Sequence, residues 1–327
     1  MRKARLGAAG PEITRIGLGT WALGGAEWRY AWGPQDDADS IAAIRRAMDL
    51  GISWIDTAAV YGHGHSEEVV GRAIEGRRDE VLVVTKCGRI PRHDGTIEGC
   101  LHADSLRREL EASLRRLRTD RIDLWQMHWP MPDEGIEEGW AEIAKAVREG
   151  KVRWAGVSNF DTAQLKRVQA IHPVTSLQPP YSMLRREVEV ELLPYCAANG
   201  IGVIVYSPLQ AGLLTGAFTR ERAAALPGND WRRDNPRFKE PELSANLALV
   251  EELRAIAARR GCSVGELAIA WVLRRPGVTG AIVGARRPDQ IEGTVGAADL
   301  RLTGDELSEI ERLLAARTRA LGTPPRG

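Results

Sequence analysis

The sequence has few of the features that stabilise small secreted proteins or anchor a chain in a membrane. Its four cysteines are scattered over 327 residues and form no CxxC pair, which argues against a disulfide framework and against a zinc site. No stretch approaches the ~20 apolar residues of a membrane span, and the N-terminus lacks the apolar run of a signal peptide. These absences predict a cytoplasmic protein with no membrane partner.

Neither positive nor negative charge is in clear excess. Lys and Arg together number 45 and Asp and Glu 44, which gives a net charge of +1. A balance of this kind creates no overall field that would attract nucleic acid. We therefore expect a small-molecule carbonyl or alcohol as the partner, with any anion site formed locally, and the sequence does not indicate the oligomeric state.

Short apolar runs alternate with amphipathic helices along the whole chain. There are eight such runs, and most of them lack the in/out alternation of half-exposed strands, which is typical of a parallel sheet buried on both faces. The runs are at residues 16–20, 52–55, 81–85, 122–127, 152–157, 174–177, 203–206 and 281–283. The helical patterns between and after them are at residues 38–50, 67–75, 106–117, 135–149, 162–171, 188–198, 246–259 and 288–298.

Eight strand–helix units with right-handed crossovers close into a (β/α)8 TIM barrel more readily than into an open sheet, which usually stops nearer six strands. We therefore predict a single α/β barrel domain over residues 1–327. Residues 2–13 predict a β-hairpin at the bottom of the barrel, and residues 210–243 a long functional loop after strand seven. A further helix is expected at 304–315, with a loose tail from about residue 317.

Titratable side chains fall at the ends of successive predicted strands. Asp56 follows the second strand, Lys86 the third and His128 the fourth, while Tyr61 lies on a glycine-flanked turn after Asp56. The active site of an α/β barrel lies where its strands end. Taken singly, such an Asp is often only a helix cap and such a His a buried structural residue, but their joint placement indicates a catalytic site.

These residue types suit the reduction of a carbonyl group. Such a reaction needs a hydride at carbon and a proton for the developing alkoxide, and Tyr61 is the candidate acid. Because a free phenol has a pKa of about 10, we expect Lys86 to lower the pKa of Tyr61. Asp56 would keep Lys86 charged, and His128 would orient the carbonyl as a neutral imidazole.

The motifs around these residues resemble those of the aldo-keto reductases. The resemblance rests on Ile-Asp-Thr-Ala-Ala-Val-Tyr-Gly (55–62), Val-Thr-Lys (84–86) and Met-His-Trp-Pro (127–130). Three weaker motifs match in the same order, namely Gly-Thr-Trp (19–21), Gly-Val-Ser-Asn-Phe (156–160) and Tyr-Ser-Pro-Leu (206–209). The resemblance covers nearly the whole chain. Within the family, the chain resembles the branch of potassium-channel β-subunits and general stress proteins. The resemblance implies catalytic roles for Asp56, Tyr61, Lys86 and His128.

The second half of the chain carries groups suited to a nicotinamide dinucleotide. Ser158, Asn159 and Gln178 can hydrogen-bond a carboxamide, and Tyr206 offers a flat face for the nicotinamide ring. The predicted cofactor-binding residues are Thr20, Trp21, Asp56, Ser158, Asn159, Gln178, Tyr206, Ser207, Pro208, Leu209, Gly212, Leu213, Gly284, Arg286, Gln290 and Thr294.

The segment after the eighth strand predicts which dinucleotide is bound. Arg286 stands just before a helix that begins with Pro288, and a basic helix start is an anion site. The resemblance implies that Arg286 binds the adenosine 2′-phosphate and that Gln290 faces the adenine, so NADP(H) is the expected cofactor. Thr294 stands where many family members carry Asn, which puts its contact with the adenine in doubt.

Aromatic residues gather in loops at the same rim and predict a pocket for an apolar or sugar-like carbonyl. The predicted pocket residues are Trp21, Trp28, Trp32, Tyr61, His128 and Trp129. Tryptophans can also simply stabilise long loops, so the roles of Trp28 and Trp32 stay open. No metal is predicted, because His63 and His65 have no third ligand at a useful spacing.

The sequence favours reversible, NADPH-dependent reduction of an aldehyde or ketone, with two alternatives. An NADPH-binding regulatory or partner-binding module with slow turnover is one, since the potassium-channel β-subunits resemble this family. A barrel lyase or isomerase that uses Lys86 as a Schiff-base nucleophile is the other. Turnover assays and borohydride trapping distinguish the three.

Overall fold

A computed structural model, which describes residues 1–92, 94–228 and 230–322, places the apolar runs in a closed sheet of eight parallel strands. The strands are β3 (Ile16–Gly19), β4 (Trp54–Asp56), β5 (Leu82–Cys87), β8 (Ile122–Met127), β9 (Val152–Ser158), β10 (Ser176–Gln178), β11 (Gly202–Val205) and β12 (Val278–Gly284). Their order is β10-β11-β12-β3-β4-β5-β8-β9, and β9 pairs with β10 to close the barrel. The predicted fold is confirmed, and each of the eight predicted strands overlaps an observed one.

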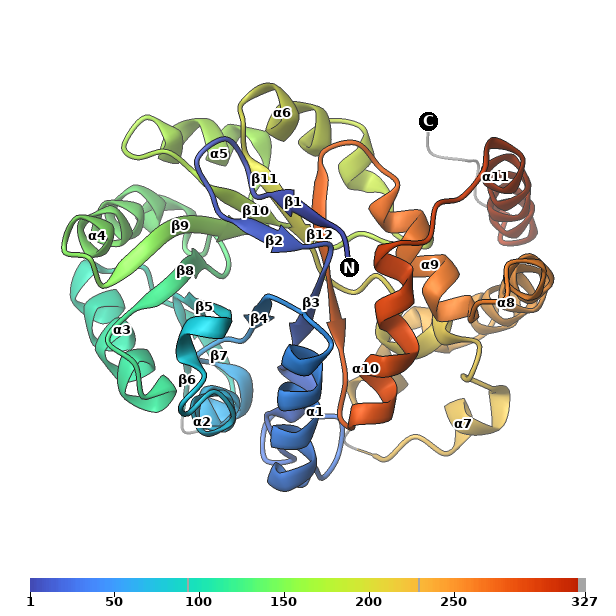
Figure 1. Ribbon diagram of the computed structural model, residues 1–327, viewed down its shortest axis with the longest axis horizontal. Coiled ribbons are helices and arrows are strands. Elements are labelled where there is room, and N and C mark those ends of the chain that lie inside the picture. Colours follow the sequence, from blue (N-terminus) through green and yellow to red (C-terminus); the bar gives the residue numbers. More distant parts are fainter. Residues whose placement is uncertain (93, 229, 323–327) are drawn as a thin grey trace.

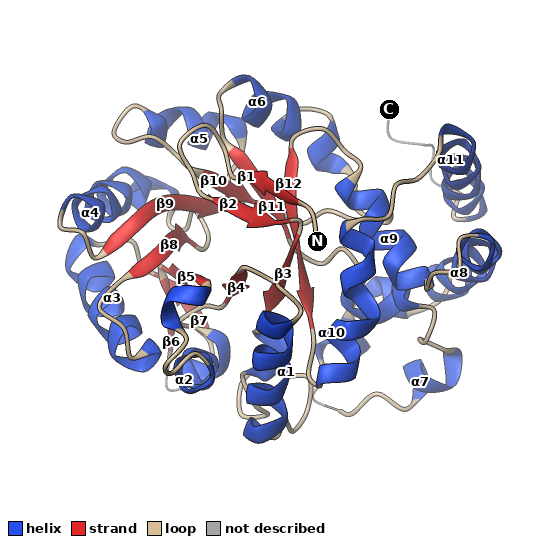
Figure 2. Cartoon of the chain, viewed as in Figure 1, coloured by secondary structure: helices blue, strands red, loops and turns tan. Residues whose placement is uncertain are grey.

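Helices surround the barrel on its outer side, as Figures 1 and 2 show. They form because apolar residues recur on one face: in α3 (Ala103–Leu117), four leucines spaced three or four residues apart are all buried. The other helices around the sheet are α1 (Asp37–Asp49), α2 (His65–Ala73), α4 (Ile136–Arg148), α5 (Thr162–Gln169), α6 (Leu192–Ala198), α9 (Val264–Leu273) and α10 (Pro288–Val295). Two further helices, α8 (Glu242–Arg259) and α11 (Gly304–Ala320), pack against each other.

The predicted N-terminal hairpin is present and lies across one end of the barrel (Figure 1). Its strands β1 (Lys3–Arg5) and β2 (Glu12–Thr14) pair in antiparallel register. Leu6 and Ile13 are buried and join a cluster of residues from the barrel strands. The hairpin thus closes the end of the barrel opposite to the strand ends that carry the candidate site.

Helix α9, which lies between α8 and β12, was not predicted. Nine of its ten residues are buried, so it has no polar face and no helical periodicity appears in the sequence. Ser263 and Glu266 form a capping box at its start, in which each side chain accepts from the other residue's backbone N–H. This Ser-x-x-Glu pattern was the available signal for the helix.

The long loop predicted after strand seven follows β11, and it contains more local structure than expected. It includes the short helix α7 (Arg220–Ala224), and α8 begins within the range predicted as irregular. The loop has its own apolar cluster, formed by Leu213, Phe218, Leu226, Phe238 and Leu243. A second hairpin that was not predicted, β6 (Arg89–Pro91) with β7 (Ile97–Gly99), follows β5.

The end of α11 contradicts part of the predicted loose tail. The helix continues to Ala320, because Arg317 donates from Nε to Asn246 Oδ1 at 2.6 Å and forms an ion pair with Glu242. Residues 323–327 of the predicted tail lie outside the described residues. In the part of the chain that the structure describes, none of the helices has the length and apolar character needed to cross a bilayer. That the chain is a single domain stays a prediction.

The close packing of Gly17 in β3 against Trp54 gives a test of the barrel core. A Cβ at Gly17 would lie 2.2 Å from Cε2 of the indole, so Gly17→Ala should reduce the free energy of unfolding by about 1–3 kcal/mol through overpacking. Gly293→Ala in α10 is the control, since its added carbon meets no atom within 4 Å. Urea unfolding of both variants measures the difference, and a Gly17→Ala protein as stable as wild type contradicts the packing.

Candidate active site

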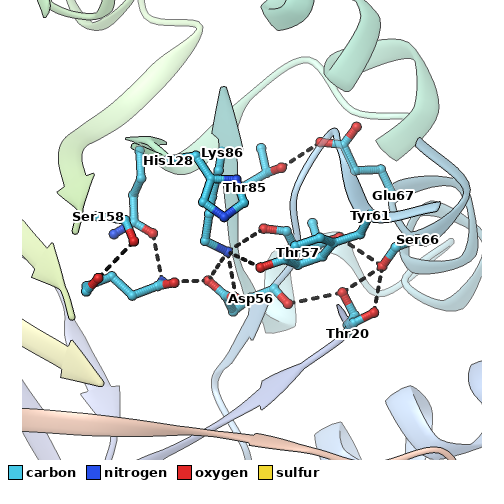
Figure 3. Close-up of polar contacts among 12 residues, drawn as sticks. Thr20, Asp56, Thr57, Tyr61, Ser66, Glu67, Thr85, Lys86, His128 and Ser158 are labelled. Atoms are coloured by element: carbon cyan, nitrogen blue, oxygen red, sulfur yellow. Dashed lines mark hydrogen bonds and ion pairs between the residues drawn. The ribbon is translucent and has the colours of Figure 1, made fainter. Parts of the chain in front are cut away.

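The candidate site is built around a buried ion pair on two neighbouring strands. Asp56 ends β4, and Lys86 lies near the end of β5, which pairs with β4 in parallel. Lys86 Nζ donates to Asp56 Oδ1 at 2.9 Å and Oδ2 at 2.7 Å, and to the backbone oxygen of Thr57 at 2.8 Å (Figure 3). Lys86 is 1% exposed and Asp56 3% exposed. Closure of the barrel therefore removes both charges from water together.

Burial and pairing act on the two groups in opposite directions. Burial raises the pKa of Asp56 and lowers the pKa of Lys86, and the attraction between the two charges reduces both shifts without cancelling them. Gln178, the last residue of β10, adds a hydrogen bond from Nε2 to Asp56 Oδ1 at 2.8 Å. The carboxylate is thus held from two sides of the barrel.

Tyr61 lies beside this pair on a tight turn. Its hydroxyl oxygen is 3.3 Å from Lys86 Nζ, and Nζ is 5.0 Å from the centroid of the phenol ring. The next residue, Gly62, has a φ of 58°, and a Cβ there would lie 1.9 Å from the backbone oxygen of Gly24. Only glycine fits this turn, which brings the loop at Gly24 against the Tyr61 segment.

The electrostatics of Tyr61 differ from the sequence-based expectation. Burial and the charge of Asp56 raise the pKa of Tyr61 well above its ordinary value. The expectation that Lys86 lowers the pKa of Tyr61 is therefore wrong in direction for this structure. The main cause is burial, and the charge of Asp56, which binds the Lys86 ammonium through both oxygens, adds to it. Tyr61 therefore rests as the protonated phenol, whose hydroxyl can donate a proton.

His128 follows β8 and completes the group of four. Its backbone N–H donates to the Cys87 oxygen at 3.0 Å, and its ring meets the Tyr61 ring edge to face, with centroids 5.8 Å apart. Burial, Lys86 and Arg89 lower the pKa of His128 well below its usual value. The imidazole is therefore neutral, as expected. The effect of Arg89 on His128 was not predicted, because Arg89 lies in the unpredicted hairpin and nothing in its local sequence pattern relates it to His128.

The residues predicted for the nicotinamide form one connected network. Ser158 Oγ donates to the Gln178 oxygen at 2.8 Å, and Asn159 Nδ2 donates to Ser158 Oγ and to the His128 oxygen, both at 3.0 Å. Tyr206 donates from its hydroxyl to Asn159 Oδ1 at 2.8 Å. Since Gln178 also binds Asp56, this network is continuous with the ion pair.

A second network behind the ion pair was not predicted, apart from Thr20. Thr20 donates from N and Oγ1 to the backbone oxygen of Asp56 at 2.9 and 3.0 Å. Ser66 Oγ donates in turn to Thr20 Oγ1 (Figure 3). Glu67 is fully buried and accepts from Thr85 Oγ1 at 2.6 Å, next to Lys86. No sequence pattern indicated a role for Glu67, because a carboxylate in the first turn of a helix is ordinary.

The predicted pocket residues come together only in part. Trp21 stacks on Tyr61 with centroids 6.3 Å apart, and Trp28 lies 5.9 Å from the same ring. Trp32 reaches this group through Trp21, at 6.5 Å. Trp129 is 38% exposed and makes no ring contact with another aromatic residue in the described ranges. The aromatic group thus covers Tyr61, and Trp129 is not part of it.

The residues predicted after β11 lie in a tight turn. Ser207 has a φ of 56° and Gly212 a φ of 100°, with Pro208 and Leu209 between them. The side chain of Leu213 is fully buried in the apolar cluster of the long loop, so only its backbone is available to a ligand.

The residues predicted for the adenosine end follow β12, whose last residue is Gly284. The backbone N–H of Arg286 donates to Gln290 Oε1 at 2.7 Å. Thr294 Oγ1 donates to the Ile291 oxygen within its own helix at 2.9 Å. The Arg286 guanidinium is turned toward the loop that follows β3, and donates from Nη1 to the Trp32 oxygen at 3.1 Å.

Comparison with known proteins places this chain among characterised sequences. The model of the Aldo/keto reductase family matches residues 15–315. Aldo-keto reductase YhdN of Bacillus subtilis is 41% identical over 320 residues, which cover 96% of this chain and 94% of the relative. NADH-specific methylglyoxal reductase of Escherichia coli is 34% identical over 333 residues, which cover 98% and 100% of the two chains.

Solved structures of related proteins also superpose on this chain. Glycerol dehydrogenase AKR11B4 from Gluconobacter oxydans superposes with a TM-score of 0.88 at 37% identity, covering 96% of this chain and 95% of that one. An aldo/keto reductase from Klebsiella pneumoniae in complex with NADP and acetate superposes with a TM-score of 0.74 at 31% identity, covering 99% and 96%.

The lowered pKa of His128 predicts a pH dependence of stability. In the unfolded chain a histidine has a pKa of about 6.5, so below that pH the unfolded chain takes up a proton that folded His128 does not. Stability is therefore lost as the pH falls. Between pH 6.5 and 5.5, the wild-type unfolding free energy should drop by about 1 kcal/mol more than that of His128→Gln. Urea titrations at both pH values measure this, with exposed His102→Gln as the control; parallel profiles for wild type and His128→Gln contradict it.

Proposed function

Because the chain belongs to the aldo/keto reductase family, we propose that it reduces an aldehyde or ketone to the alcohol, reversibly, with NADPH as the reductant. The observation that carries this proposal is the placement of the Tyr61 hydroxyl, 3.3 Å from Lys86 Nζ, above an ammonium that Asp56 holds through both oxygens. A protonated phenol at the end of the barrel strands, beside a neutral imidazole, is what protonation of a carbonyl oxygen needs.

In this proposal Tyr61 and His128 act on the substrate oxygen, while Lys86, held by Asp56, acts on the Tyr61 oxygen. NADPH, when bound, supplies the hydride for the carbonyl carbon. Tyr61 gives its proton to the oxygen as negative charge develops there, and solvent later returns a proton to the phenolate. Lys86 stabilises the phenolate at that moment, because a charge formed 3.3 Å away polarises the ion pair. His128 donates a hydrogen bond to the same oxygen and so fixes the direction of the carbonyl.

The state of Lys86 argues against a Schiff-base mechanism. Its ammonium donates to Asp56 and to the Thr57 oxygen and is 1% exposed, so no lone pair is available to attack a substrate carbonyl. A lysine that forms Schiff bases needs the neutral amine instead. The buried carboxylate partner opposes that form.

The proposed coenzyme site extends from the ion pair to the start of α10. We assign to it the residues predicted from the sequence, namely Thr20, Trp21, Asp56, Ser158, Asn159, Gln178, Tyr206, Ser207, Pro208, Leu209, Gly212, the backbone of Leu213, Gly284, Arg286, Gln290 and Thr294. NADP(H) is proposed over NAD(H) because Arg286 has no carboxylate partner among the described residues. Its guanidinium donates to neutral oxygens, which a 2′-phosphate can replace. The NADP complex of the Klebsiella pneumoniae protein supports this choice, and the NADH-specific Escherichia coli relative makes its test necessary.

Small carbonyl compounds are the proposed substrates. The rings of Trp21 and Trp28 lie with their centroids 6.3 and 5.9 Å from that of Tyr61 and cover the proposed proton donor. The names of two similar proteins, methylglyoxal reductase and glycerol dehydrogenase, are consistent with substrates of this size. A panel of short aldehydes and ketones, followed by loss of NADPH absorbance, measures the activity.

Tyr61→Phe tests the proton donor. Removal of the hydroxyl should reduce kcat roughly 10²- to 10⁴-fold, because general acid catalysis is lost. The Kd for NADPH should stay within about twofold of wild type, because the phenol is not among the groups assigned to the dinucleotide. Tyr195→Phe, a remote tyrosine on α6, is the matched control. Full turnover by Tyr61→Phe would remove this residue from the role of acid.

Arg286→Ala tests the coenzyme assignment. The change should weaken NADPH binding by about tenfold or more and NADH binding little, because only NADPH carries the 2′-phosphate. Arg287→Ala is the control, since Arg287 is exposed and pairs with Asp289. Fluorescence titration gives both Kd values, and equal losses for the two coenzymes would reassign the arginine.

A further inference from the structure

The guanidinium of Arg286 is already held by the loop that follows β3, here called the mouth loop (residues 24–36). Nε donates to Gln35 Oε1, Nη1 to the Trp32 oxygen at 3.1 Å, and Nη2 to the Pro34 oxygen. Gln35 returns a hydrogen bond from Nε2 to the Arg286 oxygen at 3.0 Å. These contacts join segments 251 residues apart in the sequence and close the mouth loop against the start of α10.

All of these partners are neutral oxygens. The two other arginines whose charges act on Arg286 have carboxylates of their own, since Arg287 pairs with Asp289 and Arg232 with Asp230. Burial, followed by the charges of Arg287 and Arg232, lowers the pKa of Arg286. Arg286 is therefore a cation in a positive region that is bound by carbonyl dipoles alone, and a phosphate is a stronger partner than a carbonyl.

The loop and a phosphate compete for one edge of this guanidinium. An arginine binds a phosphate best through two parallel N–H groups, and the pair formed by Nε and Nη2 is occupied by Gln35 and Pro34. Nη1 donates to the Trp32 oxygen. A phosphate that binds the Nε–Nη2 edge must therefore displace Gln35 and Pro34 of the mouth loop from it.

The closed mouth loop and the long loop beside it also bury unsatisfied groups. The indole N–H groups of Trp28 and Trp32 in the mouth loop, and of Trp231 in the long loop, are buried and have no hydrogen-bond partner among the described residues. Trp32 lies against the Arg232 guanidinium at 4.5 Å, and Trp231 stacks on Trp21 with centroids 5.7 Å apart. Because a buried donor without a partner destabilises the state that buries it, the closed loop depends on its contacts with Arg286.

We infer that the mouth loop and the 2′-phosphate of a bound nucleotide compete for Arg286, which makes Gln35 a residue that sets coenzyme preference. The inference rests on the proposed function, in which Arg286 is the 2′-phosphate ligand. A nucleotide without that phosphate leaves the loop closed on Arg286. A nucleotide with it opens the loop and releases Trp32 from its position beside Trp21.

Two substitutions at Gln35 with opposite expected effects test the competition. Adenosine 2′,5′-bisphosphate and 5′-AMP are the probes, because they differ only in the 2′-phosphate and need no turnover. Gln35→Ala removes a competing acceptor and should tighten the bisphosphate about threefold to tenfold. Gln35→Glu places a carboxylate against Arg286 and should weaken the bisphosphate at least tenfold. Neither change should alter the Kd for 5′-AMP by more than about twofold.

Controls separate this competition from general damage to the loop. Tyr30→Phe, a neutral change in the same loop at a 36% exposed residue, should leave both Kd values unchanged. In an Arg286→Ala background, Gln35→Ala should have no further effect on bisphosphate binding, because the competing pair is gone. Hydrogen exchange in residues 24–36 should rise when the bisphosphate binds, and should not rise with 5′-AMP.

The outcomes are distinct. Weaker bisphosphate binding by Gln35→Ala would mean that Gln35 orients Arg286 for the phosphate, and would overturn the competition alone. Equal changes for both nucleotides would overturn it as well. A wild-type chain that binds neither nucleotide would overturn the proposed function together with this inference.

Discussion

The buried pair of Lys86 and Asp56 is the interaction on which the rest of the site depends. Each charge would cost several kcal/mol to bury alone, and two short contacts to both carboxylate oxygens offset that cost. The Thr57 oxygen and the Gln178 amide complete the hydrogen bonding. This geometry requires β4, β5 and β10 to be fixed relative to one another, which a closed barrel ensures and an open sheet edge does not. The fold and the electrostatics of the site therefore stabilise each other.

The same pairing decides what Tyr61 can do. A lone ammonium would stabilise the phenolate at all times, whereas an ammonium bound by a carboxylate leaves the phenol protonated in the resting enzyme. In the proposed mechanism, the proton then leaves Tyr61 only when negative charge develops on the substrate oxygen. Neutral His128 fits this arrangement, because a second positive charge at the same place would oppose Lys86.

Local sequence patterns predicted the framework well because barrel strands and their ends are local features. Asp56, Lys86 and His128 could be placed at one rim from strand boundaries alone, and the parallel register then brought the first two into contact. Helix α9 was missed because burial on all sides removes the periodicity that marks a helix. The direction of the Tyr61 pKa was missed because it depends on a short carboxylate–ammonium distance, which no spacing in the sequence fixes.

The mouth of the barrel was the least predictable region, and the reason is physical. Its contacts join loops that are far apart in the chain, such as Gln35 with Arg286 and Arg232 with Trp32. They consist of backbone carbonyls, ring faces and single hydrogen bonds, none of which leaves a residue pattern. Contacts of this kind are weak one by one and can exchange partners, whereas the ion pair below cannot. The barrel strands can therefore hold the reacting groups rigid while the loops above them adjust to the nucleotide, and a change in coenzyme preference need not disturb the four residues at the strand ends.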